Sequence, residues 1–393
     1  MKRAEVLQGV RRMRFIDVFG RHESGNLSQA EAAELLGIGE RTFRRWCRRY
    51  EAEGEAGLLD RRLGKPSPKR VPQREAEQVE RLYRERYAGF TAKHFHEYLV
   101  REHGFNWGYS WTKTFLQGRG LIASAPRRGA HRRKRPRRPM VGMMLHQDGS
   151  SHRWIPGLDR ELDLIVTMDD ATNEIYSMFL VEEEGTFSSL RGLSEVFSAK
   201  GLFCSLYSDR GSHYFYTPKA GEKVAKNVLT QVGRALAQLG IEHIPAYSPE
   251  ARGRSERAFR TLQDRLPKEL HLAGITDMDA ANRFIALSYL AEHNRRFAVT
   301  PAEAGSAFVP ARPQQWTDVL CLQHERIVGN DNTVAIGGLR LQIPAATSRA
   351  HFVRAKVRVH HYDDGTYAIF HGPRRLGSYD PTGVLIEAQK CAA

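Results

Sequence analysis

The alternation of apolar and polar positions divides the chain into a helical first third, a mixed central region and a strand-rich tail. In the central region, apolar runs of strand length predict five strands, at 143–150, 162–168, 175–182, 203–209 and 241–246. Helices are expected at 187–199, at 226–239 and from about Arg254 onward. Three strands followed by alternating helices and strands predict an α/β domain, which we place at residues 142–310.

Residues 27–50 show the helical period of two short helices joined by a turn. Ser28 and Glu31 fit the S-x-x-E capping box that opens a helix. Gly37 can supply the left-handed conformation of the turn that follows. We expect this unit to be a folded domain over residues 1–65.

The second of these helices, about residues 40–50, separates apolar from basic positions. Phe43, Trp46 and Tyr50 share one face. The remaining surface carries five arginines in nine residues, namely Arg41, Arg44, Arg45, Arg48 and Arg49. One interpretation is a helical hairpin with solvated arginines. The density of arginines without an interleaved acid favours a helix-turn-helix whose second helix lies in a groove of DNA.

A second helical module is predicted over residues 72–123, after a linker that contains Pro66, Pro68 and Pro72. Its helices are expected near 74–87, 92–102 and 111–118, with Thr91 and Ser110 as N-caps. We expect Trp107, Trp111 and Phe115 to form its core. The module is interpreted as a further helix-turn-helix-like DNA-binding domain.

The tail, residues 325–390, carries paired strand patterns around tight turns. Gly337-Gly338 separates two short apolar runs, and Asp364-Gly365 separates two more. Both dipeptides suit hairpin turns, so a small C-terminal β-barrel domain is predicted. Four basic residues could give it a DNA-contacting face, although a domain that only packs is equally compatible with them: Lys356, Arg358, Arg374 and Arg375.

Charge is distributed unevenly along the chain. The formal net charge is +15, but residues 1–140 hold 32 Lys and Arg against 16 Asp and Glu, whereas residues 141–393 hold 28 against 29. The first third is therefore suited to a polyanion. Residues 126–139 contain eight basic residues and three prolines, which predicts an extended basic linker over 124–141. Within it, the run that we expect to contact the DNA backbone is Arg132, Arg133, Lys134 and Arg135.

Bulk composition excludes several classes of protein. A hydrophobic content of 41% and a mean hydropathy of −0.51 are typical of a soluble globular chain. We find no apolar run long enough for a membrane span and no secretory signal at the N-terminus, so a cytoplasmic, nucleoid-associated protein is expected. Cys47, Cys204, Cys321 and Cys391 lack metal-ligand spacing. No P-loop pattern is present, and ATP use is not predicted.

Three carboxylates occupy positions where a sheet of this kind places an active site. The order of strands and helices is that of the ribonuclease H-like fold, in which the first and fourth strands are adjacent. Asp148 lies on the first strand, Asp209 ends the fourth, and Glu256 opens the helix after the fifth. We expect the three to converge, as catalytic groups and metal ligands.

The chemistry that suits such a cluster is phosphodiester cleavage assisted by metal ions. Two divalent ions about 3.5–4 Å apart can activate one oxygen and stabilise another. Carboxylate oxygens suit Mg²⁺, with Mn²⁺ as a substitute. Asp169 and Asp170, after the second strand, compete with these positions but are interpreted as residues that bound a turn. Glu250 competes with Glu256, but it lies in a loop, and Glu256 is preferred.

The motifs around these carboxylates resemble those of bacterial insertion-sequence transposases with an integrase catalytic core. The resemblance is carried by four segments in order: His146-Gln-Asp-Gly149, Tyr207 to Phe215, Ser248 to Leu266, and His293 to Pro301. The overall layout looks like the ISNCY-type group. One departure is Arg210, where related integrases commonly carry Asn.

The resemblance implies DDE-type chemistry. Water would nick the transposon ends, and the freed 3′-OH would then attack target DNA. It also implies that the partners are double-stranded DNA, both terminal inverted repeats and target, and a homodimer or higher multimer that pairs two ends. Three rival interpretations stay open: a transcription regulator, a structure-specific nuclease of the same fold, and an inactive copy.

Overall fold

The structure is a computed structural model of the chain, and it describes residues 3–60, 70–124, 136–218, 224–225, 227–247, 253–345, 349 and 351–386. The chain divides into two compact units, Met1–Leu82 and Tyr83–Ala393. Among the described residues, no helix combines the length and the apolar character that crossing a bilayer requires.

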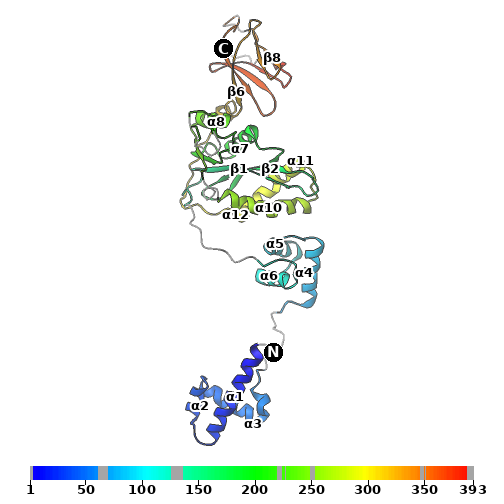
Figure 1. Cartoon of the computed structure of the whole chain (residues 1–393), viewed down its shortest axis with the longest axis vertical. Helices are drawn as coiled ribbons and strands as arrows, with labels where there is room; N and C mark the ends of the chain where they lie inside the picture. The colour runs from blue at the N-terminus through cyan, green and yellow to red at the C-terminus, as the bar shows by residue number, and fades with distance from the viewer. Residues whose placement is uncertain are drawn as a thin grey trace. The chain divides into compact units, whose positions relative to one another are not determined.

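The first unit is built from short helices around an aromatic core. Phe15 and Phe43 are fully buried, and Trp46 and Tyr50 pack against them. The apolar face predicted for residues 40–50 therefore faces the core. The elements of this unit are α1 (Arg3–Glu23), α2 (Gln29–Leu35), α3 (Glu40–Glu53), the 3₁₀ helix η1 (Gly54–Leu58) and the greater part of α4 (Gln73–Glu85) (Figure 1).

The predicted capping box at the start of α2 is confirmed. The Ser28 hydroxyl accepts a hydrogen bond from the Glu31 backbone N–H, and the Glu31 carboxylate accepts one from the Ser28 backbone N–H at 2.8 Å. Two N–H groups that the helix cannot satisfy internally gain partners in this way. Gly37, at φ +65°, makes the left-handed turn between α2 and α3.

The next three helices are α4 (Gln73–Glu85), α5 (Ala92–His103) and α6 (Tyr109–Gly118), close to the predicted ranges. The prediction of their core was wrong. Buried side chains come from α4, α5, α6 and the residues between these helices, whereas Trp107, Trp111 and Phe115 are only half-buried. The reason is periodicity, because α6 turns Thr112 and Leu116 inward and leaves Trp111 and Phe115 stacked on its flank. The buried aromatic and aliphatic residues include Val79, Tyr83, Tyr87, Phe90, Phe95, Tyr98, Leu99, Phe105 and Leu116.

Ser110 was also assigned wrongly as an N-cap. The N-cap of α6 is Gly108, so Ser110 already lies in the first turn. Thr91 does occupy the N-cap of α5, although its side chain makes no capping hydrogen bond there.

The central domain contains a five-stranded sheet in the order β3-β2-β1-β4-β5. β1, β2 and β3 pair antiparallel, whereas β4 is parallel to both β1 and β5. The predicted α/β architecture of the ribonuclease H-like type is confirmed. The strands are β1 (Leu145–His152), β2 (Leu162–Asp169), β3 (Ile175–Val181), β4 (Ser205–Ser208) and β5 (Glu242–Pro245).

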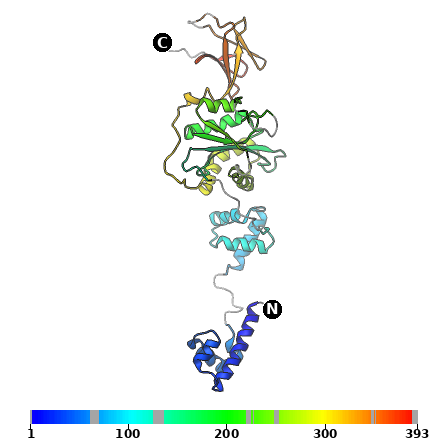
Figure 2. The same cartoon turned by 60° about the vertical axis from the view of Figure 1, so that its left-hand side comes forward.

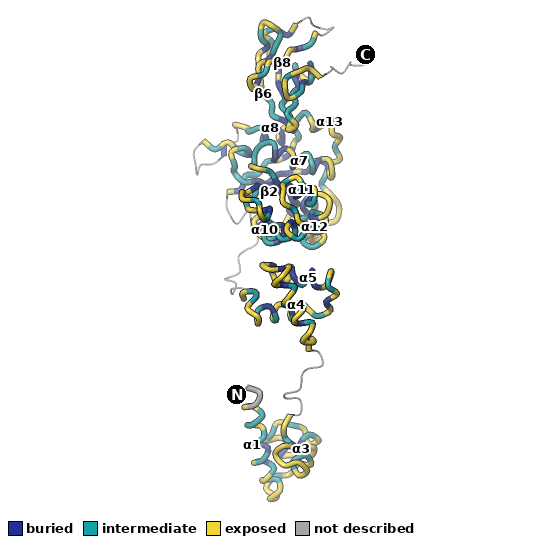
Figure 3. Tube along the Cα trace, turned by 90° about the vertical axis from the view of Figure 1, so that its right-hand side faces the viewer, coloured by how far each residue is buried: buried dark blue, intermediate teal, exposed yellow. Residues whose placement is uncertain are grey.

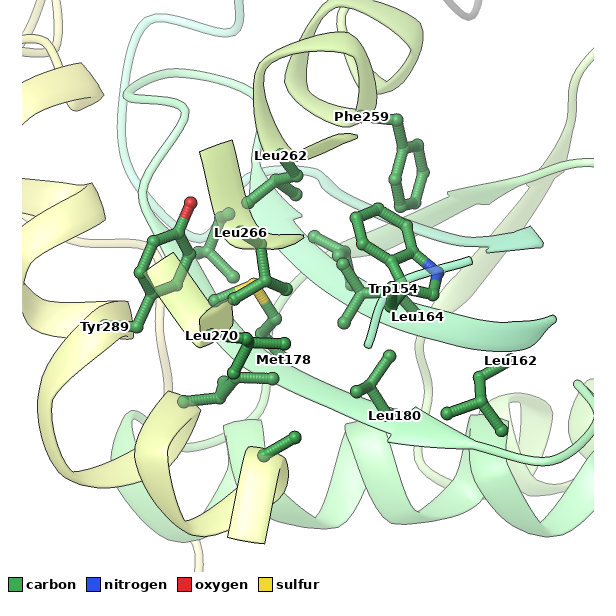
Figure 4. Packing of buried hydrophobic residues seen from close by; sticks show 14 of the residues in the cluster. Trp154, Leu162, Leu164, Met178, Leu180, Phe259, Leu262, Leu266, Leu270 and Tyr289 are labelled. Atoms are coloured by element: carbon green, nitrogen blue, oxygen red, sulfur yellow. The ribbon is translucent and has the colours of Figure 1, made fainter. Parts of the chain in front are cut away.

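Helices cover both faces of this sheet (Figure 1 and Figure 2). On one face, apolar residues of α10 pack against β2 and β3, and Figure 4 shows Leu262, Leu266 and Leu270 directed at the strands. On the other face α7 and α8 enclose a second apolar cluster. Figure 3 shows β2 buried between these layers. The helices are α7 (Thr186–Ala199), α8 (Gln231–Gln238), α10 (Ser255–Leu272), α11 (Met278–Phe284), the π-helical η2 (Ile285–Tyr289), α12 (Leu290–Phe297) and α13 (Pro313–Trp316).

α5 contacts α10 and α12 through charged side chains. Arg265 donates two hydrogen bonds to the Glu97 carboxylate, at 2.8 and 3.2 Å, and Arg296 donates another to it. His94, fully buried, lies 2.7 Å from a carboxylate oxygen of Glu269. The second unit therefore includes a polar interface between α5 and the helix that follows β5.

The C-terminal region is a small β domain, as predicted, but the described strands form no closed barrel. A five-stranded sheet runs β12-β11-β10-β9-β6, and β7 pairs only with β8. β12 and β6 stay at opposite edges, so the sheet is open. Both predicted hairpins are present, around Gly337-Gly338 and around 362–366. The strands are β6 (Leu322–Ile327), β7 (Thr333–Ile336), β8 (Leu339–Gln342), β9 (Lys356–His361), β10 (Tyr367–His371), β11 (Arg374–Tyr379) and β12 (Leu385–Ile386).

Candidate active site

Asp148 lies on β1, and Asp209 directly follows β4, the parallel strand beside β1. In β1 and β4, Leu145 pairs with Leu206 and His146 with Tyr207. Continued by two residues, this register would set Asp148 against Asp209. Neighbouring strands lie about 4.8 Å apart, and residues two apart on a strand share a face. The strand pairing therefore brings Asp148 and Asp209 to the same end of two neighbouring strands.

The face of the sheet to which Asp148 points is the one that α10 covers. Asp148 pairs with Val166 in the antiparallel β1–β2 ladder, and directly paired residues point to the same side. Val166 belongs to the apolar cluster formed with α10, whereas Gln147 points the other way and donates a hydrogen bond to the Ser189 carbonyl on α7. Asp148 itself is buried.

Glu256 lies in the first turn of α10, and that helix runs alongside β1. Near its start, Arg254 donates a hydrogen bond to Asp170, which also binds His146 on β1. Further along, Gln263 donates a hydrogen bond to the Ser150 hydroxyl at 3.0 Å. The nine residues from Arg254 to Gln263 advance α10 by about 13 Å, and the four residues from His146 to Ser150 advance β1 by the same distance. The two contacts are therefore equally far apart on the helix and on the strand.

The side of α10 that carries Glu256 is the side that contacts β1. Glu256 and Gln263 are seven residues apart, which places them on one stripe of a helix. The Glu256 side chain is exposed, in contrast to Asp148. Within the described ranges, however, no three Asp, Glu, His or Cys side chains approach closely enough to form a metal-holding group. The structure thus places Asp148 on β1, Asp209 directly after the neighbouring β4, and Glu256 on the adjoining helix.

Negative charge is concentrated at this end of the sheet. Tyr214 is fully buried, and burial raises its pKa well above the ordinary value, with the carboxylates of Glu184, Asp148 and Asp209 raising it further. The oxygen donors of the candidate site are hard, anionic ligands. They fit Mg²⁺ or Mn²⁺ better than a thiolate-preferring metal.

Glu184 and His213 are polar residues near this end of the sheet that the sequence did not reveal. A Cβ on Gly149, which lies on the sheet face opposite Asp148, would be 2.2 Å from a carboxylate oxygen of Glu184, so a larger residue here would require the Glu184 side chain to move. His213 Nε2 lies 3.4 Å from Glu184. The glycine in His146-Gln-Asp-Gly149 was the available signal, but its neighbour is 35 residues away along the chain.

Asp169 and Asp170, the competitors of the predicted carboxylates, have different surroundings. Asp169 holds a turn, since its Oδ1 accepts hydrogen bonds from the backbone N–H groups of Ala171 and Thr172 at 2.8 and 2.9 Å. Burial acts to raise the pKa of Asp170. Hydrogen bonds from His146 and from the Arg138 backbone, with the positive charges nearby, outweigh it and hold this pKa well below its usual range. Glu250, the other competitor, lies outside the described residues.

The predicted DNA-contacting arginines of α3 lie on its outer surface. Arg41, Arg44, Arg45 and Arg48 are exposed, whereas Arg49 is half-buried and donates a hydrogen bond to the Leu59 carbonyl. The basic run of the linker, Arg132, Arg133, Lys134 and Arg135, lies outside the described residues.

Comparison with known proteins identifies the class to which this architecture belongs. A family of helix-turn-helix domains matches residues 17–67. The inferred transposase y4bF of Sinorhizobium fredii is 33% identical over 352 residues, covering 89% of this chain and 76% of that protein. The transposase for insertion sequence IS1202 of Streptococcus pneumoniae is 28% identical over 56% of this chain and 46% of its own length. The protein is a helix-turn-helix protein of DNA transposition. The chain belongs to the insertion-sequence transposases.

Among the solved structures with some likeness are two of viral origin. The integrase catalytic core of HTLV-2 in complex with magnesium matches 37% of this chain and 83% of its own, with a TM-score of 0.28 and 15% identity. The intasome of simian T-cell lymphotropic virus in complex with the PP2A regulatory subunit B56 gamma matches 80% and 100%, with a TM-score of 0.32 and 13% identity. At scores this low, the likeness has no bearing on the site.

Proposed function

We propose that this transposase is of the DDE type, with Asp148, Asp209 and Glu256 as its catalytic residues. The observation that supports the proposal is the parallel pairing of β1, which carries Asp148, with β4, which Asp209 directly follows, while Glu256 opens the helix that contacts β1. Carboxylates brought close together repel each other, and such an arrangement is costly unless a cation neutralises it.

The residues present fit a divalent cation, Mg²⁺ with Mn²⁺ as a substitute. A pair of such ions held by Asp148, Asp209 and Glu256 would activate the attacking oxygen and stabilise the departing one. The chain itself supplies rigid placement. Asp148 is fixed by a strand paired on both sides, and Glu256 by a helix packed on the sheet.

The reaction proposed for this site has two phosphoryl-transfer steps. In the first, water attacks a phosphodiester at the transposon end, and the bond to the 3′ oxygen breaks to leave a free 3′-OH. In the second, that 3′-OH attacks a target phosphodiester, forms a new bond to phosphorus and releases the target strand's own 3′ oxygen. The number of phosphodiester bonds is conserved in the second step, so no ATP is needed.

DNA binding is assigned to separate parts of the chain. The exposed arginines of α3 would lie along a groove of the terminal repeat, and the basic linker would follow phosphates. Two ends must meet for transposition, and a symmetric dimer or higher multimer is the simplest assembly that joins them.

The test is incubation of the purified full-length chain with labelled terminal repeats and Mg²⁺, scored for nicking and for joining of a pre-cleaved 3′ end. Asp148→Ala should abolish both while leaving end binding intact. Asp159→Ala, which alters a fully exposed carboxylate elsewhere in the domain, is the matched control and should behave as the wild type. Nicking without joining would indicate a nuclease, and full activity of Asp148→Ala would reject the assignment.

A further inference from the structure

The carboxylate of Asp170 joins the strand of Asp148 to the helix of Glu256. Asp170 directly follows β2 and is fully buried. Its Oδ1 lies 2.7 Å from His146 Nε2 on β1 and also accepts a hydrogen bond from Arg254 at the N-cap of α10. Its Oδ2 accepts a hydrogen bond from the Arg138 backbone N–H at 2.7 Å. One buried group therefore links β1, α10 and the chain that enters the central domain.

The two side chains that Asp170 binds lie two residues before the candidate carboxylates. His146 shares one face of β1 with Asp148, whereas Arg254 precedes Glu256 at the start of α10, where residues two apart point in nearly opposite directions. Fixing His146 against Arg254 thus fixes the spacing between the two backbone segments that carry the carboxylates.

The apolar packing of α10 leaves its first turn to polar contacts. The apolar cluster beneath the helix includes Ala258, Phe259 and residues beyond them, but none of residues 254–257. Arg254, by contrast, has only 13% of its side chain exposed where it meets Asp170. A charged hydrogen bond of this kind, shielded from water, is strong and directional.

We infer that Asp170 is a positioning residue, which holds the first turn of α10, and with it Glu256, against the Asp148 strand. The inference rests on the proposed function, because the position of Glu256 matters to the reaction only if Glu256 takes part in it. Asp170 itself touches neither DNA nor the reacting atoms in this role. It acts through Arg254 and His146.

The first measurement is amide hydrogen exchange on the full-length chain. Asp170→Asn keeps the size of the side chain but removes its charge, so exchange in residues 253–258 should accelerate by at least about tenfold while residues 262–270 stay protected. Asp169→Asn is the matched control, because Asp169 is equally buried and adjacent but binds the turn at Ala171 and Thr172. It should leave residues 253–258 unchanged.

The second measurement is joining of pre-cleaved ends with Mg²⁺. A shift of about 1 Å in a reacting group can cost on the order of 10²-fold in rate. Asp170→Asn should therefore lower kcat for joining by about 10²-fold with little change in KM for DNA, while Asp169→Asn keeps the wild-type kcat. Arg254→Met should reproduce the Asp170→Asn effect, and the double variant should be no slower than the slower single one, because both remove one link.

The outcomes separate the inference from the proposed function. Unchanged exchange in residues 253–258 would overturn the inference whatever the activity, and so would additive losses in the double variant. An equal loss in Asp169→Asn would reduce Asp170 to a general stability residue. If Asp170→Asn does not fold, Arg254→Met carries the same test. If the wild type binds ends without ever nicking or joining them, the proposed function fails, and faster exchange in Asp170→Asn would still support the link to α10.

Discussion

The α3 helix and the β1–β4–α10 site differ in how the sequence encodes them. α3 exposes Arg41, Arg44, Arg45 and Arg48 through local helical periodicity, and these four point outward independently of distant residues. The proposed site would require Asp148, Asp209 and Glu256, far apart in sequence, to meet through strand pairing and helix packing. From this contrast we expect that DNA binding by α3 declines gradually as single arginines are replaced, whereas catalysis at the proposed site is lost when any one carboxylate is replaced.

The largest effect is expected from Asp209→Asn. Removing one charge from a group that works as a unit should lower nicking and joining by roughly 10³-fold or more. Combining it with Asp148→Ala should add almost nothing. End binding, measured by gel shift, should equal that of the wild type because α3 is untouched. If the single losses multiply in the double variant, the two carboxylates act separately and the contrast with α3 disappears.

Local sequence patterns were enough to predict α3 and the strands. Contacts between side chains that are distant in sequence were not predicted. Phe43, Trp46 and Tyr50 could be placed on one face because the helical period alone decides it. The adjacency of β1 and β4 followed from the expected strand order. The contacts of Asp170 and Glu184 could not be predicted, since each depends on a side chain that only the folded sheet brings near.

The errors have the same origin. Aromatic content suggested Trp107, Trp111 and Phe115 as a core, but burial in a small helical module depends on how its helices pack, which the sequence of α6 alone does not specify. The closed barrel was inferred from hairpin turns, which fix neighbouring strands but leave open whether the first and last strands pair. The catalytic roles of the three carboxylates stay predictions.

A second, smaller effect is expected from Glu97→Gln at the α5–α10 interface. Burial acts to raise the pKa of Glu97, but hydrogen bonds and charges of Arg265 and Arg296 outweigh it and lower the pKa below its ordinary value. In the variant, the largely buried guanidinium of Arg265 loses the negative charge of its ion-pair partner. The free energy of unfolding at pH 7 should fall by about 2–3 kcal/mol.

The pH dependence of that effect has a definite sign. A carboxyl whose pKa is lowered on folding stabilises the protein above its unfolded pKa, and this contribution is lost as pH falls through the folded pKa. The difference in the free energy of unfolding between the wild type and Glu97→Gln should therefore be largest near neutral pH. It should shrink as the pH falls below about 4. Denaturation of the full chain across pH 7 to 3 measures it. If the stabilities of the wild type and the variant changed in parallel with pH, Glu97 would not be ionised in the interface. α5 would then resemble α3 in relying on packing alone.

A single arginine of α3 should give a modest, graded loss. Arg44→Gln should weaken end binding by up to about tenfold and reduce the slope of log K against log salt by about 0.9, if Arg44 contacts one phosphate. Joining at saturating DNA should be unchanged, which separates α3 from the carboxylate site. Arg21→Gln, an exposed arginine at the end of α1, is the control. An unchanged slope in Arg44→Gln would remove α3 from the DNA interface.

The smallest effect is expected at a helix cap. Ser28→Ala removes the hydroxyl that accepts from the Glu31 backbone N–H and should cost about 1 kcal/mol of stability in the first unit. Ser110→Ala removes a hydroxyl from within the first turn of α6, where Gly108 is the cap, and should cost less than about 0.5 kcal/mol. Thermal unfolding of both variants compares them directly. Equal costs would mean that the capping box contributes nothing beyond an ordinary serine, and the locally encoded stability attributed to the α2–α3 unit would have to come from its aromatic core.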